Sequence, residues 1–104
     1  MVRVSVLYAN GEGRKFDMAY YTGKHLPLVR EKLGAACKGI TVDQGLGGGQ
    51  PGSRPPFVAM VHMLFDSVDA WQAAFGPHAK TIMADIPNYT DIQPTIQISE
   101  AKAL

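Results

Sequence analysis

The chain has 104 residues, 46% of them hydrophobic and 18% charged, and carries a formal net charge of +1 at neutral pH. These values predict one globular domain spanning residues 1–104. They exclude global disorder, a basic nucleic-acid-binding surface and a membrane-spanning helix. A single cysteine and a start without a signal-peptide pattern lead us to expect a cytoplasmic protein with no disulfide.

A strand and a long helix are predicted at the start of the chain. Residues 2–8 alternate between the two sides of a strand, with Tyr8 on the same side as the three valines. Asp17 is a favourable N-cap, and an apolar stripe at helical spacing predicts a helix from residue 18 to about residue 36. The stripe consists of Met18, Thr22, Leu26, Val29, Leu33 and Ala36.

Pro27 lies inside this predicted helix. Its ring would clash with the carbonyl group of Gly23 and it donates no hydrogen bond, so we expect a kink or a break there. His25 falls on the flank of the apolar stripe and Tyr21 near its edge, so both side chains can face the interior.

Two further strands are predicted in the middle of the chain. Residues 38–46 carry spaced apolar side chains and predict the second strand. Residues 47–56 are rich in glycine and proline and predict a flexible loop between strands. Residues 57–65 are apolar nearly throughout, with His62 as the exception, which predicts a central strand buried on both faces.

The last third of the chain predicts a second helix and a fourth strand. Asp66 and Ser67 can cap the helix, and the Gly-Pro pair at residues 76–77 should break or bend it. Residues 84–91 are predicted to form a polar loop. Residues 92–99 alternate as the last strand.

The resulting order β-α-β-β-α-β predicts an α+β, ferredoxin-like sandwich. Both helices would cover one face of a four-stranded antiparallel sheet. The other face would have an apolar centre, because the central strand has no polar side. Such a face usually finds a partner, so we expect a homodimer that packs the open face of one sheet against that of its partner.

Motifs for metal, nucleotide and serine-nucleophile chemistry are missing from the chain. Its three histidines and Cys37 lack the spacings HxxxH, HExxH and CxxC, so no metal site is predicted. Gln50 stands where a phosphate-binding GxGxxG motif needs its third glycine, and no GxSxG motif is present. We therefore expect no cofactor.

His25 is the leading candidate for a catalytic residue, because an imidazole can accept and deliver a proton near neutral pH. The alternative is a packed His25 that bonds a carbonyl group freed by Pro27. Tyr21 lies one turn earlier, where it can orient His25 or polarise a substrate carbonyl. The alternative for Tyr21 is an amphipathic residue at the rim of the core.

A small apolar ligand is expected in a pocket beside His25. The candidate binding residues are Tyr8, His62, Trp71, Phe75, His78 and Asp85. Packing roles stay open for them: His62 as a satisfied core histidine, His78 as a capping or packing residue, and the aromatic residues as core. The polar loop that includes Asp85 either closes the mouth of the pocket or only satisfies the ends of neighbouring elements.

Three motifs follow each other along the chain. They are Phe16-Asp17-x-x-Tyr20-Tyr21-x-x-Lys24-His25-x-Pro27-Leu28-Val29, Phe65-Asp66-Ser67, and Ala84-Asp85-Ile86-Pro87-Asn88-Tyr89-Thr90-Asp91-Ile92, which runs into Pro94 and Ile96-Gln97-Ile98-Ser99. In these motifs the chain resembles the EthD family, named for its association with the degradation of ethyl tert-butyl ether.

The resemblance implies a dimeric α+β barrel in which each protomer encloses a pocket between its helices and the concave sheet. The family's motif histidine corresponds to His25 and would face that pocket. The wider superfamily includes lactone isomerases, polyketide cyclases and monooxygenases that need no metal or organic cofactor. The family name records a pathway and does not define a reaction.

Three functional hypotheses follow. The first is a cofactor-independent enzyme of small-molecule catabolism or secondary metabolism, an isomerase, cyclase, lyase or monooxygenase-like protein. In it, His25 would transfer a proton on an apolar carbonyl compound or lactone, assisted by Tyr21. The second is a non-catalytic accessory protein that binds a hydrophobic ligand for an oxidative degradation pathway. The third is an interaction domain with a fully packed interior, which the presence of a pocket would argue against.

Overall fold

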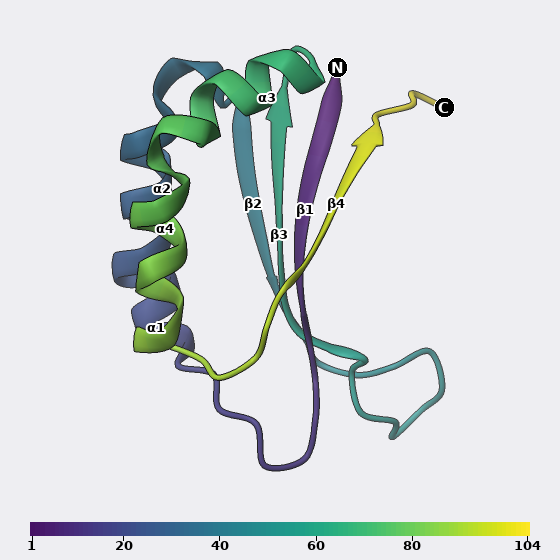
Figure 1. Ribbon diagram of the computed structural model, residues 1–104. Coiled ribbons are helices and arrows are strands. Elements are labelled where there is room, and N and C mark those ends of the chain that lie inside the picture. Colours follow the sequence, from purple (N-terminus) through teal and green to yellow (C-terminus); the bar gives the residue numbers. More distant parts are fainter.

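Four antiparallel strands and two helical segments make up the computed structural model, which describes residues 1–104 (Figure 1). The strands pair in the order β2-β3-β1-β4, and the helices all lie on one face of the sheet. This arrangement confirms the predicted ferredoxin-like β-α-β-β-α-β fold. The strands are β1 (Val2–Ala9), β2 (Gly39–Gln44), β3 (Phe57–Phe65) and β4 (Thr95–Glu100).

The first helical segment covers Met18 to Ala36, as predicted, but it changes geometry along its length, and its α-helical part ends before Gly34, whose φ is +63°. It consists of α1 (Met18–Tyr20), the π-helical turn η1 (Tyr21–His25), α2 (Leu26–Leu33) and the 3-10 turn η2 (Gly34–Ala36). Asp17 caps it, since its carboxylate accepts a hydrogen bond from the backbone N–H of Tyr20 at 3.1 Å. This bond satisfies one of the donors that every helix leaves free at its start.

The expected disturbance at Pro27 takes the form of the π-helical turn. The backbone N–H of Leu26 bonds to the carbonyl oxygen of Tyr21, five residues earlier, so this turn holds one more residue than an α-helical turn. In α-helical geometry the ring of Pro27 would press on the carbonyl group of Gly23. The wider turn gives the ring room, and the helix continues past the proline.

The extra residue also changes which side chains face the sheet. Tyr21 is 0% exposed and His25 is 4% exposed, whereas Thr22 is exposed to solvent. The prediction that Tyr21 and His25 can face the interior is confirmed. The prediction that Thr22 belongs to the buried stripe is wrong, because a uniform advance of 100° per residue does not hold through η1.

The second helical segment begins at the predicted N-cap, where the hydroxyl group of Ser67 accepts a hydrogen bond from the N–H of Ala70. Its parts are α3 (Val68–Phe75), the 3-10 turn η3 (Gly76–His78), α4 (Ala79–Asp85) and the 3-10 turn η4 (Ile86–Asn88). The bend at residues 76–77 is confirmed by η3. The predicted loop 84–91 is wrong in its first half, which is helical through Asn88, and β4 begins at Thr95, later than predicted.

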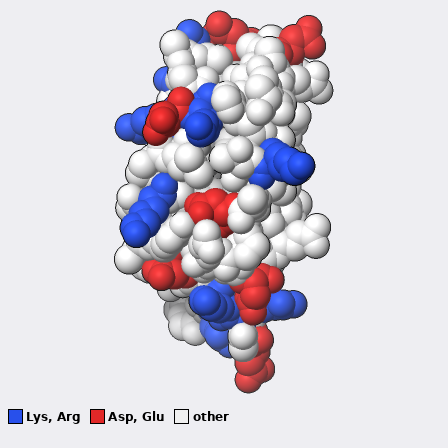
Figure 2. Space-filling model, turned by 60° about the vertical axis from the view of Figure 1, so that its left-hand side comes forward, with Lys and Arg blue, Asp and Glu red and all other residues white.

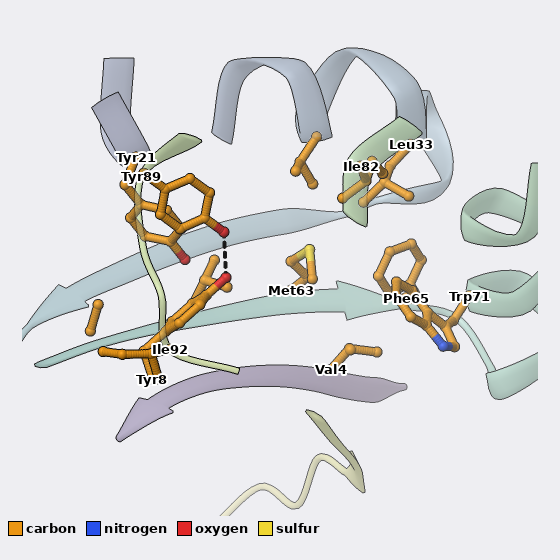
Figure 3. Packing of buried hydrophobic residues seen from close by; sticks show 13 residues of the cluster. Val4, Tyr8, Tyr21, Leu33, Met63, Phe65, Trp71, Ile82, Tyr89 and Ile92 are labelled. Atoms are coloured by element: carbon orange, nitrogen blue, oxygen red, sulfur yellow. Dashed lines mark hydrogen bonds between the residues drawn. The ribbon is translucent and has the colours of Figure 1, made fainter. Parts of the chain in front are cut away.

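The core lies between the helices and one face of the sheet (Figure 3). Alternation on β1 places Val4 and Tyr8 on this face, as predicted, and β3 contributes Met63 and Phe65. The helices add a third group of buried side chains, including Trp71. The opposite face of the central strand β3 is half-buried in this chain, because no helix covers it.

Charged side chains of both signs are interspersed over the helical face of the molecule (Figure 2). No large area of that view is covered by Lys and Arg alone. The distribution matches the near-balance of 10 basic and 9 acidic residues in the sequence. No helix is both long and apolar enough to cross a membrane.

Candidate functional site

A hydrogen-bonded histidine–aspartate pair joins the two helical segments. His25 lies at the end of η1 and Asp85 at the end of α4, and 2.9 Å separate His25 Nδ1 from Asp85 Oδ2. The other carboxylate oxygen, Oδ1, accepts hydrogen bonds from the hydroxyl group of Tyr20 at 2.7 Å and from the side-chain amide of Asn88 at 2.9 Å. Three donors therefore hold one carboxylate in place behind the imidazole.

Burial and hydrogen bonding fix the charges of this pair. Burial lowers the pKa of His25, and the nearby Asp85 carboxylate opposes this shift only in part. For Asp85, burial acts to raise the pKa, but the hydrogen bonds from Tyr20, Asn88 and His25 outweigh it, so the pKa lies below its usual range. At neutral pH His25 is thus a neutral imidazole that donates its Nδ1 proton to the ionised Asp85. Its second nitrogen, Nε2, makes no hydrogen bond in the structure.

We expect the imidazole of His25 to titrate below pH 6.5, the ordinary histidine value. The unfolded chain then binds this proton at higher pH than the folded chain, so the free energy of unfolding should fall as the pH drops below about 6.5. NMR titration of the histidine ring signals, assigned with His25→Gln, measures the pKa directly. An inflection for His25 at or above pH 6.5 would contradict the burial argument.

A cluster of buried phenols surrounds the imidazole. The hydroxyl groups of Tyr8 and Tyr89 bond to each other at 2.6 Å, drawn as the dashed line in Figure 3. The ring of His25 stacks on that of Tyr21 at a centroid distance of 5.7 Å and an interplanar angle of 16°, and it lies 4.6 Å from the ring of Tyr89. Burial raises the pKa of all three tyrosines, so they stay protonated and can donate hydrogen bonds.

A small apolar cavity lies beside His25, between the helices and the sheet. Its volume is about 40 Å³, and 14 of its 16 lining residues are hydrophobic. This volume holds a few water molecules and is well below that of a typical ligand pocket. Two lining residues, Met83 on α4 and Ile96 on β4, are each 44% exposed, so the cavity reaches the surface between these elements.

The cavity brings together five of the eight residues that the sequence singled out. These are Tyr8, Tyr21, His25, Trp71 and Phe75. Asp85 does not line the cavity and instead bonds to the far side of the imidazole.

Two histidines lie elsewhere, which corrects the expectation that they line the same pocket. His62 is on the opposite face of the sheet, where Nδ1 is 2.7 Å from Ser5 Oγ and Nε2 is 3.6 Å from a carboxylate oxygen of Asp43. Its position follows from the register, which pairs His62 with Ser5 on the outward side of β1. His78 is half-buried in η3 and outside the cavity.

Three residues of the site were not assigned a role from the sequence, namely Tyr20, Asn88 and Tyr89. All three occur in the family motifs, and this was the one sign in the sequence that could have identified them. The 3-10 turn η4 places Asn88 beside Asp85, three residues earlier. The loop predicted for this segment does not imply that these two side chains are neighbours. No group of three or more His, Cys, Asp and Glu side chains is arranged to hold a metal ion.

The sequence profile of the EthD domain matches residues 10–93. The crystal structure of an EthD-like protein from Ralstonia eutropha JMP134 is 46% identical, covers 95% of this chain and 89% of its own, and superposes with a TM-score of 0.91. A dimeric ferredoxin-like protein of unknown function from Bacteroides fragilis is 12% identical. Its match covers 96% of this chain and 95% of its own, with a TM-score of 0.54.

A putative antibiotic biosynthesis monooxygenase from Bordetella bronchiseptica shares the fold as well. It is 12% identical, with coverage of 99% of this chain and 96% of its own and a TM-score of 0.62. At this identity the likeness concerns the fold alone. No curated protein matches the chain in sequence.

Proposed function

Because the chain belongs to the EthD domain family, we propose that it is a cofactor-independent enzyme in which His25 transfers a proton on a small apolar carbonyl compound or lactone. The observation that carries this proposal is the His25–Asp85 pair beside an apolar cavity. General acid–base catalysis by histidine uses an imidazole that a carboxylate orients through one nitrogen and whose second nitrogen is free, and His25 has this arrangement.

The proposed reaction uses only side chains of this protein. His25 Nε2 takes a proton from the carbon next to the carbonyl group, and the electron pair of that C–H bond moves to the carbonyl oxygen as an enolate. Asp85 lies against Nδ1, so its negative charge stabilises the imidazolium that forms. The imidazolium then returns the proton to the same carbon or to a conjugated one, which gives an exchanged substrate or an isomer.

A non-catalytic role as a hydrophobic-ligand-binding accessory protein of an oxidative pathway is the second candidate. The almost wholly apolar lining of the cavity favours it, since such a lining binds apolar molecules whether or not they react. In that role His25 would only hydrogen-bond the ligand. The two roles differ in one observable, the exchange of a carbon-bound proton with solvent.

NMR in D₂O tests both roles. A panel of lactones, β-dicarbonyl compounds and apolar ketones would be incubated with the wild type, with His25→Ala and with His78→Ala as the matched histidine control outside the cavity. We expect deuterium to enter at an acidic C–H position with the wild type and the control but not with His25→Ala. Line broadening of a ligand without any exchange would support the binding role, and equal exchange with His25→Ala would refute the assignment.

We also infer that two copies of the chain pair through the open face of the sheet. On β3 this face carries the half-buried apolar side chains Val58, Met60 and Leu64, which no helix covers. A second copy would remove them from water, as expected for an isologous interface. Sedimentation at micromolar concentration should give twice the chain mass of 11.2 kDa, and a monomer would contradict the inference.

A further inference from the structure

The hydroxyl group of Tyr21 is the one buried side-chain polar atom that has no hydrogen-bond partner. Tyr21 is 0% exposed and lines the cavity beside His25. Buried polar groups are almost always satisfied, and the hydroxyl group of Tyr21 calls for an acceptor that the chain does not supply. The neighbouring hydroxyl groups of Tyr8 and Tyr89 already bond to each other, whereas that of Tyr21 makes no hydrogen bond.

We propose that Tyr21 Oη binds the oxygen atom of the ligand, and that the ligand class is an enolisable ketone bound as its enolate, for which a phenolate is a stable mimic. This inference rests on the proposed function and names the substrate class of the same site.

The turn η1 places the two side chains beside the same cavity. Tyr21 and His25 are one turn apart, with rings that are nearly parallel and 5.7 Å between centroids, and both line the cavity. An enolate oxygen and the carbon that loses its proton are separated by two bonds, so one can meet the phenol while the other meets the imidazole. Burial, reinforced by the neighbouring Tyr8, keeps Tyr21 protonated, so it donates a hydrogen bond without releasing its proton.

The rest of the ligand would extend toward the surface. The cavity of about 40 Å³ is too small for a ring, but it opens between α4 and β4 beside Met83 and Ile96. A methionine side chain has three rotatable bonds and adapts readily, so a shift of Met83 widens the opening without moving the backbone. The lining of the cavity is apolar, which suits a ligand whose only polar group is the oxygen atom and whose remainder is hydrocarbon.

Titration with 4-nitrophenol tests the assignment, because its ionised form carries an oxygen anion on an apolar ring and absorbs visibly. The wild type, Tyr21→Phe and the control Thr22→Val, an adjacent hydroxyl outside the cavity, would be compared at a pH where the probe is partly ionised. We expect Tyr21→Phe to weaken phenolate binding about 10- to 100-fold, the range of a hydrogen bond to a charged group, and Thr22→Val to leave it unchanged.

Thermal unfolding separates this role from a structural one. Tyr21→Phe removes no hydrogen bond within the chain, so its Tm should be equal to that of the wild type or higher. Equal phenolate affinity in the wild type and Tyr21→Phe, or no binding to the wild type, would overturn the inference even if proton exchange requires His25. Phenolate binding that depends on Tyr21, together with proton exchange that persists in His25→Ala, would refute the proposed function and leave the oxygen site standing.

Discussion

Replacing Tyr89 with alanine should lower the free energy of unfolding by about 3–5 kcal/mol, the range for truncating a large buried aromatic residue. Tyr89 is fully buried, and its ring contacts those of Tyr8, Phe16, Tyr21 and His25. The change leaves a cavity at the centre of this cluster and removes the hydrogen-bond partner of Tyr8. Urea denaturation followed by circular dichroism measures the loss.

Tyr89→Phe is the matched control. It keeps the ring and removes only the hydroxyl group, which leaves the buried hydroxyl of Tyr8 without a partner, so the expected loss is about 1–3 kcal/mol. A loss below about 1 kcal/mol for Tyr89→Ala would mean that the cluster collapses around the gap or does not contribute to the stability of the fold.

Asp85→Asn should lower the rate of proton exchange catalysed by the protein by about 10²- to 10⁴-fold while leaving the chain folded. An amide can present its NH₂ group to Nδ1 of His25, which moves the imidazole proton to Nε2 and removes the lone pair that faces the substrate. The corresponding change in the serine-protease triad costs about 10⁴-fold for this reason. Deuterium incorporation measures the rate, and ¹⁵N shifts of the imidazole report which nitrogen carries the proton.

Asp43→Asn provides the control for this experiment. Asp43 lies near His62 on the opposite face of the sheet, so the same chemical change is made beside a histidine that does not line the cavity. Its exchange rate should equal that of the wild type. A rate for Asp85→Asn within a factor of about three of the wild type would show that the carboxylate does not orient the base, because a single triad-like partner is normally worth far more.

Local patterns in the sequence predicted the fold well. The caps at Asp17 and Ser67, the central strand at 57–65 and the alternation of β1 each depend on neighbours within a few residues, and each is confirmed. The prediction that the central strand is buried on both faces is wrong for the single chain, because its outer face is half-buried. The position of His62 could not be predicted in the same way. Both faces of β3 carry apolar side chains, so alternation alone does not say which face is inward, and the pairing with β1 decides it.

The site was predicted only in part, because its central contact spans the chain. His25 and Asp85 are 60 residues apart, and no local pattern indicates that the end of α4 meets η1. The sequence predicts Asp85 as part of a loop that contacts a ligand, whereas it is a helical residue that bonds to His25. The helical turn η4 was not predicted either, because Pro87 and Asn88 are residue types that are typical of loops.

The π-helical turn at residues 21–25 takes up one extra residue without rotating the helix on either side of it. Deleting the exposed Gly23 would therefore turn the bond between Leu26 and Tyr21 into an ordinary α-helical one and leave both residues on their present faces. A deletion in the regular α-helix α2 has no such turn to take it up, so it would rotate the residues before it by about 100° relative to those after it. The same loss of one residue can thus be silent at one point of a helix and, a turn away, move a functional group out of the cavity while the order of elements stays the same.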